Sequence, residues 1–270
     1  MTPVLSGVRA LLLDLEGTIY EMGHPVPGAA AALEEIDRRG IPTRFVTNTT
    51  SRPRRRLLAE LSSMGLPAEA HRVFTAPRAA REFLLAKGWT RAHLVVKPAL
   101  LEDFDGIEED TTAPQAVVLG DLGEDTTFDR LNRAFRLLLG GAEFVTLARN
   151  RYYQGHDGLL LDQGPFVAAL EYASGRAATL VGKPSLEFFS GALRALGVSP
   201  SEAAVVGDDL EADVGGGQMA GMRGVLVRTG KFREGDLARS AVRPDAVLDS
   251  IAALPAVLPA RPAAASRRSR

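Results

Sequence analysis

Short apolar runs alternate with helix-like segments along almost the whole chain, and this alternation leaves few folds open to it. The runs have the length and composition of buried strands, whereas the segments between them carry apolar residues at helical spacing. Strands that alternate with helices predict an α/β fold built on parallel sheets. The expected strands are Val8–Leu13, Thr43–Val46, His93–Val96, Ala116–Leu119, Phe144–Leu147, Ala178–Val181, Ala203–Val206 and Gly224–Val227. The clearest expected helices between them are Arg130–Leu139, Phe166–Ala173 and Leu186–Leu196.

Two further helices are predicted from signals at their ends. Pro27 opens the first and Gly40 ends it, which is the usual asymmetry of a helix with proline first and glycine last. The pair Thr50/Ser51 is expected to cap the second helix, which Gly65 ends.

Composition excludes several classes of protein. The 270 residues suffice for one large or two modest domains, and a formal net charge of −1 gives no overall attraction to nucleic acid or an anionic membrane. The absence of cysteine excludes disulfides and thiolate metal sites. The N-terminal apolar run is too short and too acidic for a signal peptide, and no segment approaches a membrane span. We therefore expect a cytoplasmic protein that binds neither nucleic acid nor membrane, with a disordered tail at 256–270.

Polar residues directly follow several of the expected strands. In open α/β sheets, ligands bind beyond the carboxyl ends of the strands, where the strand order reverses. Several acids, a hydroxyl and a lysine therefore fall where such a crevice would lie. The segments in question are Asp14-Leu-Glu16, Thr47-Asn48, Gly182-Lys183-Pro184 and Gly207-Asp208-Asp209, with Asp213 one turn further on.

A carboxylate beside a hard cation suits phosphoryl transfer. Asp14 can attack phosphorus and form an aspartyl-phosphate, which water then hydrolyses. Mg²⁺ usually takes one or two carboxylates together with water and phosphate, and Asp14 and Asp208 can provide them. Asp209 and Asp213 can hold these ligands or the bound waters in position without binding the ion themselves.

The remaining residues of the predicted site carry positive charge or donate hydrogen bonds. Lys183 would balance the clustered anions, while Thr47 and the Asn48 backbone N–H would hold the phosphoryl oxygens. Each segment alone has an ordinary explanation, such as a solvated turn or a helix N-cap. All four together, in this order and each at a strand end, favour a catalytic site.

The same four segments resemble the motifs of the haloacid dehalogenase superfamily. LLLDLEGTIY, RFVTNTTS, VGKPS and VVGDDLEADVGGGQMAGM stand in the order of the four motifs, and the long insertion between the second and third is similar to the larger cap of subclass IIA. The resemblance extends through AFRLLLGGA, RYYQGHDGLLLDQGPFVAALEYASG and VRTGKFR. It implies a Rossmann-like core at 1–77 and 180–255, an α/β cap of type C2 at 78–179, Mg²⁺ as cofactor, a small phosphorylated substrate and, at family level, a homodimer.

The resemblance also assigns roles to individual residues. Asp14 matches the nucleophile and metal ligand, and residue 16 matches a metal ligand that acts through its backbone carbonyl. Asp208 matches the metal-binding acid. The other matches are Thr47 and Asn48 to the phosphate-binding positions, Lys183 to the motif lysine, and Asp213 to the last acid of the fourth motif.

Glu16 departs from the family pattern. Typical family phosphatases have aspartate there, and it protonates the leaving oxygen. The extra methylene of glutamate moves the carboxyl group, and such a displacement can cost ~100-fold in rate. We therefore hypothesise that the enzyme prefers good leaving groups, such as pyrophosphate, acyl phosphates or compounds with N–P bonds.

Two other functions remain open on the sequence. Glu16 could mark a catalytically weakened protein that binds a phosphorylated ligand or a partner. Hydrolytic dehalogenation is a weaker alternative, because it uses no magnesium and would leave the acidic fourth motif without a purpose. Substrate choice is expected from the cap, whose candidate contacts are Arg149, Arg151, Tyr152, Tyr153 and the helix start Gly164-Pro165-Phe166. An ordinary exposed hairpin explains any one of them equally well.

Overall fold

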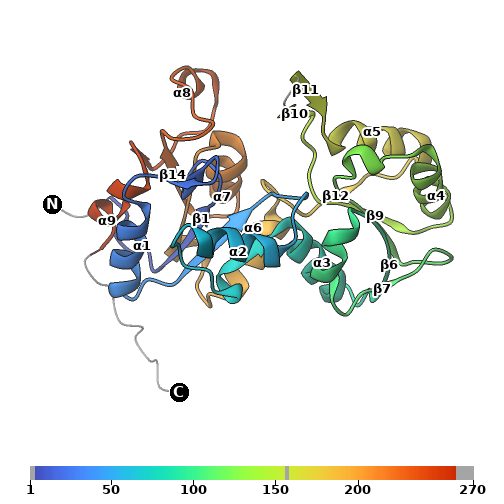
Figure 1. Ribbon diagram of the computed structural model, residues 1–270, viewed down its shortest axis with the longest axis horizontal. Coiled ribbons are helices and arrows are strands. Elements are labelled where there is room, and N and C mark those ends of the chain that lie inside the picture. The colour runs from blue at the N-terminus through green and yellow to red at the C-terminus, as the bar shows by residue number, and fades with distance from the viewer. Residues whose placement is uncertain (1–3, 156–157, 260–270) are drawn as a thin grey trace. The chain divides into compact units, whose positions relative to one another are not determined.

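Two larger sheets, one in each of two units of the chain, organise the structure (Figure 1). The computed structural model describes residues 4–155 and 158–259. The first unit comprises the described residues of 1–47, 58–73 and 192–270, and the second comprises those of 48–57 and 74–191. Helices α2 (Arg54–Ser63) and α6 (Leu186–Arg194) each cross from one unit to the other in sequence.

The sheet of the first unit has six strands in the order β15-β14-β13-β1-β4-β5. The pairs of β1 with β13 and β4, and of β14 with β13 and β15, are parallel. The three central strands are buried along their whole lengths, as is typical of parallel strands covered on both faces. The bounds are β1 Ala10–Asp14, β4 Thr43–Thr47, β5 Val73–Thr75, β13 Ala203–Gly207, β14 Arg223–Val227 and β15 Ala246–Leu248.

The strand order of this sheet reverses at β1. The chain passes from β1 to β4 on one side and returns much later to β13 on the other. Leu13 therefore lies between Phe45 and Val206 in register. The next residues along these strands, Asp14 and Gly207, bring the carboxyl ends of β1 and β13 together, which is where α/β sheets bind ligands.

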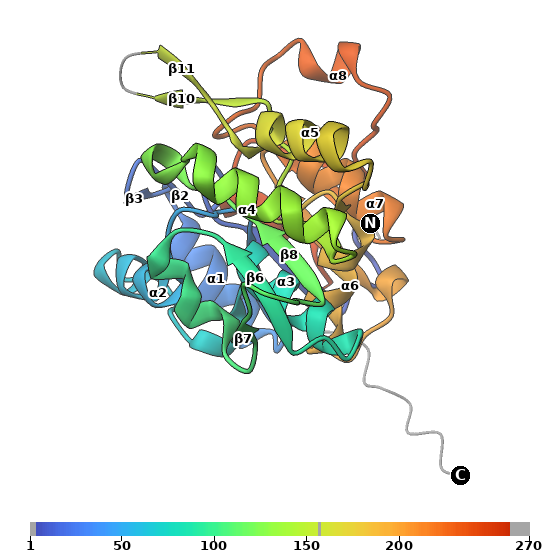
Figure 2. The same ribbon diagram turned by 90° about the vertical axis from the view of Figure 1, so that its right-hand side faces the viewer.

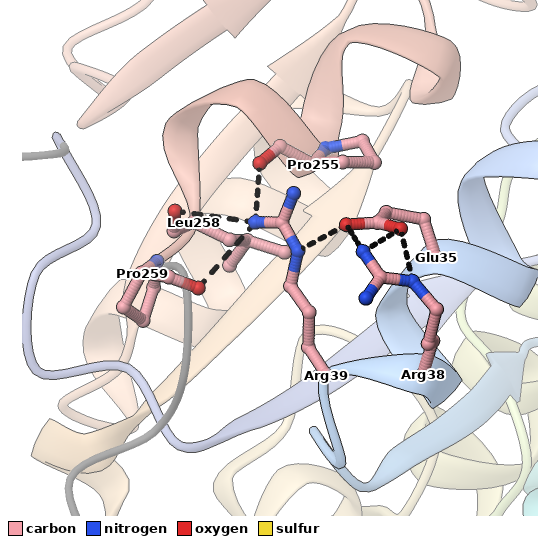
Figure 3. Close-up of polar contacts among 6 residues, drawn as sticks. All are labelled: Glu35, Arg38, Arg39, Pro255, Leu258 and Pro259. Atoms are coloured by element: carbon pink, nitrogen blue, oxygen red, sulfur yellow. Dashed lines mark hydrogen bonds and ion pairs between the residues drawn. The ribbon is translucent and has the colours of Figure 1, made fainter.

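Helix α1 (Ala29–Arg38) anchors the end of the described chain. It buries Ala29, Leu33 and Ile36 among other residues. Arg39 directly follows it and donates to the carbonyl oxygens of Pro255, Leu258 and Pro259 at 2.7, 3.5 and 3.4 Å, while its Nε donates to Glu35 (Figure 3). The segment after α9 (Leu254–Val257) is thus fastened to α1 by one side chain. This unit also contains α7 Gly216–Met219, α8 Asp236–Arg239 and the short hairpin of β2 Tyr20–Glu21 and β3 His24–Pro25.

The second unit contains a five-stranded sheet in the order β12-β9-β8-β6-β7, with every adjacent pair parallel. Its strands are β6 Arg91–Val95, β7 Glu108–Glu109, β8 Ala116–Leu119, β9 Glu143–Thr146 and β12 Thr179–Leu180. An antiparallel hairpin is formed by β10 Tyr152–Gly155 and β11 Gly158–Leu161.

Helices cover both faces of this second sheet. Ala116 and Val118 of β8 pack on α3 (Ala76–Ala86), whereas Val117 and Leu119 pack on α4 (Phe128–Leu139) and α5 (Gln163–Ser174). Figure 2 shows α4 and α5 side by side. Thr75 caps α3, Thr127 caps α4 and Asp162 caps α5, each through a side-chain oxygen that accepts a backbone N–H.

The predicted α/β class with parallel sheets is confirmed. All eight expected strands are present, with ends that differ by up to two residues from the prediction. Helix α2 begins at Arg54, and the Asp103 carboxylate, which is 49 residues away in sequence, accepts the Arg54 N–H at 3.0 Å.

The predicted tail overlaps ordered structure at its start. Helix α9 runs to Val257 and Leu258 is buried, whereas residues 260–270 lie outside the described residues. None of the described helices has the length and apolar character needed to cross a membrane.

Replacing Gly217 by alanine should destabilise the first unit by about 1–3 kcal/mol, because overpacking a close contact has that cost. A Cβ there would lie 2.2 Å from Cγ1 of Val205. Urea unfolding measures the change. Gly235→Ala is the matched control, since φ is −81° and the nearest atoms, at 3.3 Å, belong to the flexible Arg239 guanidinium. Equal destabilisation by both substitutions would contradict the packing explanation.

Candidate active site

Three buried carboxylates meet at the reversal point of the first sheet. Oxygen atoms of Asp14, Asp208 and Asp213 all lie within 4.8 Å of one another. The three residues are 6%, 3% and 1% exposed. Like charges at this separation repel each other by about 3–4 kcal/mol per pair at an effective dielectric constant of ~20. Such a group of oxygen donors fits a hard divalent cation such as Mg²⁺.

The fold positions each acid of this cluster separately. Asp14 is the last residue of β1, and Asp208 directly follows the adjacent β13. Asp213 lies on the helical turn Leu210–Gly215 that comes next. Gly207 lets that turn come close, because a Cβ on it would lie 2.3 Å from Cγ of Asp213.

Two glycines and a backbone amide hold the Asp208 carboxylate. A Cβ on Gly17 or on Gly230 would lie 2.1 Å from Oδ2 of Asp208, and both glycines have positive φ angles, of 88° and 63°. The backbone N–H of Lys231 donates to the same Oδ2 at 2.6 Å. Glycine is therefore required at both positions for the carboxylate to occupy its place.

Lys231 lies beside the acid cluster and is not among the residues predicted from the sequence. Its Nζ is 3.3 Å from Oδ2 of Asp209. Partial desolvation works to lower the pKa of Lys231, but the charges of Asp209, Asp208, Asp14 and Asp213 outweigh it and raise this pKa. Lys231 is thus a cation at the edge of the acidic group.

Asp209 serves as a helix cap. Its Oδ1 accepts the backbone N–H groups of Glu211 at 3.2 Å and Ala212 at 2.9 Å. Its own N–H donates to Oδ2 of Asp213 at 3.3 Å. Asp209 therefore orients the turn that carries Asp213, and its side chain is not part of the three-acid cluster.

Glu16 has an exposed side chain. Its Oε1 accepts the backbone N–H of Met22 at 3.0 Å, in the turn between β2 and β3. Met22 itself has a positive φ of 48°. The carboxylate of Glu16 is therefore engaged by the β2–β3 turn.

Asn48 and Lys183 pair with each other in the second unit. The Asn48 side chain donates to the Lys183 carbonyl oxygen at 2.9 Å and accepts the Lys183 N–H at 2.7 Å. Gly182 permits this approach, because a Cβ there would lie 2.8 Å from Oδ1 of Asn48 and 2.1 Å from the Leu147 carbonyl oxygen. Two segments that are 135 residues apart are thereby fixed to each other. Thr47 is the buried last residue of β4, in the first unit.

The residues of the second unit that were predicted to contact the substrate include a paired arginine, two exposed tyrosines and a phenylalanine that lines a cavity. Arg149 is paired with Glu171 at 3.0 and 2.7 Å. Tyr152 and Tyr153 of β10 are exposed. Helix α5 begins at Gln163, one residue before the predicted helix start at Gly164 and three before the expected helix Phe166–Ala173. Tyr153 and Phe166 line a cavity of about 370 Å³ together with the loop after β8.

A signal for Lys231 was present in the sequence. Asp14, Thr47, Lys183 and Asp208 were predicted because polar residues that directly follow a strand lie at the ligand-binding edge of the sheet. The residues that directly follow β14 are Arg228-Thr229-Gly230-Lys231, inside the segment VRTGKFR, so the same rule predicts Lys231.

Two family models match the chain. Residues 11–108 match the model described as haloacid dehalogenase-like hydrolase, and residues 180–254 match a second one described as HAD-hydrolase-like. Among curated proteins, haloacid dehalogenase-like hydrolase domain-containing protein 2 of Bos taurus is 45% identical over 229 residues, which are 85% of this chain and 87% of the relative. Phospholysine phosphohistidine inorganic pyrophosphate phosphatase of Rattus norvegicus is 41% identical over 254 residues, 92% and 93% of the two chains.

Solved structures show the same likeness. The 4-nitrophenylphosphatase of Thermotoga maritima superposes with a TM-score of 0.87 at 30% identity, over 94% of this chain and 98% of that one. A glycerol phosphate phosphatase of Mycobacterium tuberculosis, solved in complex with magnesium, gives a TM-score of 0.82 at 28% identity, over 94% and 78%. The resemblance that the four sequence segments indicated thus extends along nearly the whole chain.

Replacing Asp14 by asparagine should raise the melting temperature in the presence of EDTA, because it removes one of three like charges within 4.8 Å. The same variant should gain less stability than the wild type from saturating MgCl₂, since a ligand stabilises only the fold that binds it. Differential scanning fluorimetry measures both effects. Asp249→Asn, at a side chain 99% exposed, is the control. A magnesium-induced shift of equal size in Asp14→Asn and wild type would contradict a cation site at this cluster.

Proposed function

Since the chain belongs to the haloacid dehalogenase-like hydrolases, we propose that it is a Mg²⁺-dependent phosphatase or pyrophosphatase that acts through an aspartyl-phosphate on Asp14. One observation carries the proposal: the buried cluster of Asp14, Asp208 and Asp213 at the ends of β1 and β13. A carboxylate that ends a central strand beside two other acids has the surroundings of a nucleophile paired with a cation site.

The donor set fits Mg²⁺. Asp14, Asp208 and the backbone carbonyl of Glu16 would hold the ion, and Asp213 would support it through ligands or water. When bound, Mg²⁺ neutralises phosphate charge and aligns the reacting groups. Asp208 is suited to this role because the Lys231 amide fixes one of its oxygens.

The chain's own residues account for the two chemical steps. A carboxylate oxygen of Asp14 forms a bond to phosphorus while the bond from phosphorus to the leaving oxygen breaks, and that oxygen keeps the electron pair. Water then attacks the phosphorus, the Asp14–phosphorus bond breaks, and phosphate leaves. Thr47, the Asn48 N–H and Lys183 would hold the phosphoryl oxygens through both steps. The Asn48–Lys183 pair supports this, because it fixes two of these residues together.

The second unit would act as the cap that selects the substrate. We place this cap at 78–179 and the catalytic core at 1–77 and 180–255. Two relatives support a phosphorylated small molecule as substrate, since their names are those of a 4-nitrophenylphosphatase and of a pyrophosphate phosphatase.

The contacts of Glu16 support weak general-acid catalysis. Its carboxylate is exposed, and its Oε1 is already engaged by the Met22 N–H. The reaction would then depend on how well the leaving group departs without a proton.

Wild-type protein should release phosphate from p-nitrophenyl phosphate and from pyrophosphate only when Mg²⁺ is present, and Asp14→Asn should lower both rates by ~10³-fold or more, because the nucleophile is lost. Malachite-green detection of phosphate measures the rates. Asp249→Asn serves as the matched control and should retain wild-type rates. Full activity of Asp14→Asn would rule out the proposed nucleophile. The absence of turnover on both substrates would favour a protein that binds a phosphorylated ligand without hydrolysing it.

The ranking of substrates tests the role of Glu16. We expect p-nitrophenyl phosphate and pyrophosphate to be hydrolysed ~100-fold faster, in kcat/KM, than a simple alkyl phosphate, because an alkoxide needs a proton in order to leave. Glu16→Asp, which restores the family residue, should narrow this gap. The hypothesis is wrong if the alkyl phosphate is hydrolysed by the wild type as fast as pyrophosphate.

A further inference from the structure

The Asp208 carboxylate lies between two loops of the first unit, one after β1 and one after β14. A Cβ on Gly17 or on Gly230 would lie 2.1 Å from Oδ2 of Asp208, and a Cβ on Gly230 would also lie 2.6 Å from Cα of Gly17. The Lys231 N–H donates to the same Oδ2 at 2.6 Å. The position of this oxygen therefore depends on how closely the two loops are held together.

Two side chains fasten these loops to each other. Thr229 Oγ1, on the loop after β14, donates to the Gly17 carbonyl oxygen at 2.5 Å. In the opposite direction, the carboxylate of Glu21, on β2, accepts the Gly230 N–H. Each side chain contacts a backbone atom of one of the two glycines that border Asp208, so both act on Asp208 through backbone.

Asp208 needs this support because two other buried carboxylates lie within 4.8 Å of it and repel it. The Lys231 N–H opposes that repulsion by a charge-assisted hydrogen bond, but only while the loop after β14 stays in place. We propose that Thr229 and Glu21 are positioning residues for the cation site, which hold the Lys231 N–H on Asp208 and so keep this carboxylate where it binds Mg²⁺. This inference rests on the proposed function.

The ends of the loop are held independently of these two contacts. Leu226 precedes the loop and Phe232 follows it, and both are buried in one apolar cluster. Loss of a hydrogen bond at Thr229 or Glu21 should therefore loosen the middle of the loop and leave the fold intact.

The first test is Thr229→Val, which removes the hydroxyl donor and keeps a β-branched side chain of the same shape. Calorimetric titration should show Mg²⁺ affinity reduced by about 10- to 100-fold, as is usual when a group that supports a metal ligand is lost. Thr112→Val is the matched control. It also removes a hydroxyl that donates to a partner, Asp110 at 2.8 Å in the second unit, and should bind Mg²⁺ like the wild type. Wild-type affinity in Thr229→Val would overturn the inference.

Two substitutions of Glu21 separate its hydrogen bond from its charge. Glu21→Gln keeps an oxygen that can accept the Gly230 N–H, whereas Glu21→Met has no such acceptor at a similar length. We expect about wild-type Mg²⁺ affinity in Glu21→Gln and a clear loss in Glu21→Met. An equal loss in both would show that only the charge matters and would overturn the positioning role.

Hydrogen exchange in EDTA tests the same contacts without metal. The Lys231 amide should exchange at least about tenfold faster in Thr229→Val and Glu21→Met than in the wild type, because its hydrogen bond to a charged acceptor is weakened. The amide of Val205, in the middle of β13, should exchange at the wild-type rate. Equal acceleration at both amides would indicate a general loss of stability and contradict the inference. Failure of the proposed function is distinguishable, because the wild type would then bind no Mg²⁺, and the inference would fall with it.

Discussion

The mutual repulsion of Asp14, Asp208 and Asp213 is the constraint around which the first unit is arranged. Three carboxylates within 4.8 Å, all nearly inaccessible to solvent, oppose folding unless their surroundings hold them. Here the backbone around the cluster holds the three carboxylates in place. Adjacent parallel strands deliver two of the acids, the absence of a side chain at Gly17, Gly207 and Gly230 lets chain segments come close, and the Lys231 amide donates to Asp208. In the proposed function, a divalent cation bound among these oxygens would turn the repulsion into attraction.

Much of this arrangement follows from the sequence, because the decisive rule is local. A buried strand is recognisable from a few apolar residues, and parallel strands place whatever follows them at one edge of the sheet. Asp14 and Asp208 could be placed together on that basis alone. Contacts between residues that are far apart in sequence cannot be predicted from a local pattern. The Asp103 carboxylate at the start of α2 is 49 residues from Arg54, and no pattern near Arg54 predicts their contact. The engagement of Glu16 by the Met22 amide likewise depends on a turn whose conformation the sequence alone does not specify.

In the proposed function, Glu16 decides which leaving groups the enzyme can expel. A phosphatase for alkyl esters needs a proton at the leaving oxygen. The Glu16 carboxylate is exposed and accepts the Met22 N–H instead. Under that proposal, compounds whose leaving group departs without a proton are the better substrates.

The central claim is that the three acids form one cation site, and calorimetric titration with Mg²⁺ tests it most directly. The account predicts one ion per chain and a loss of affinity of at least about tenfold in Asp208→Asn and in Asp213→Asn, as is usual when a ligand or its supporting group is removed. Asp249→Asn should bind like the wild type. Magnesium binding of unchanged affinity in both Asp208→Asn and Asp213→Asn would contradict the claim.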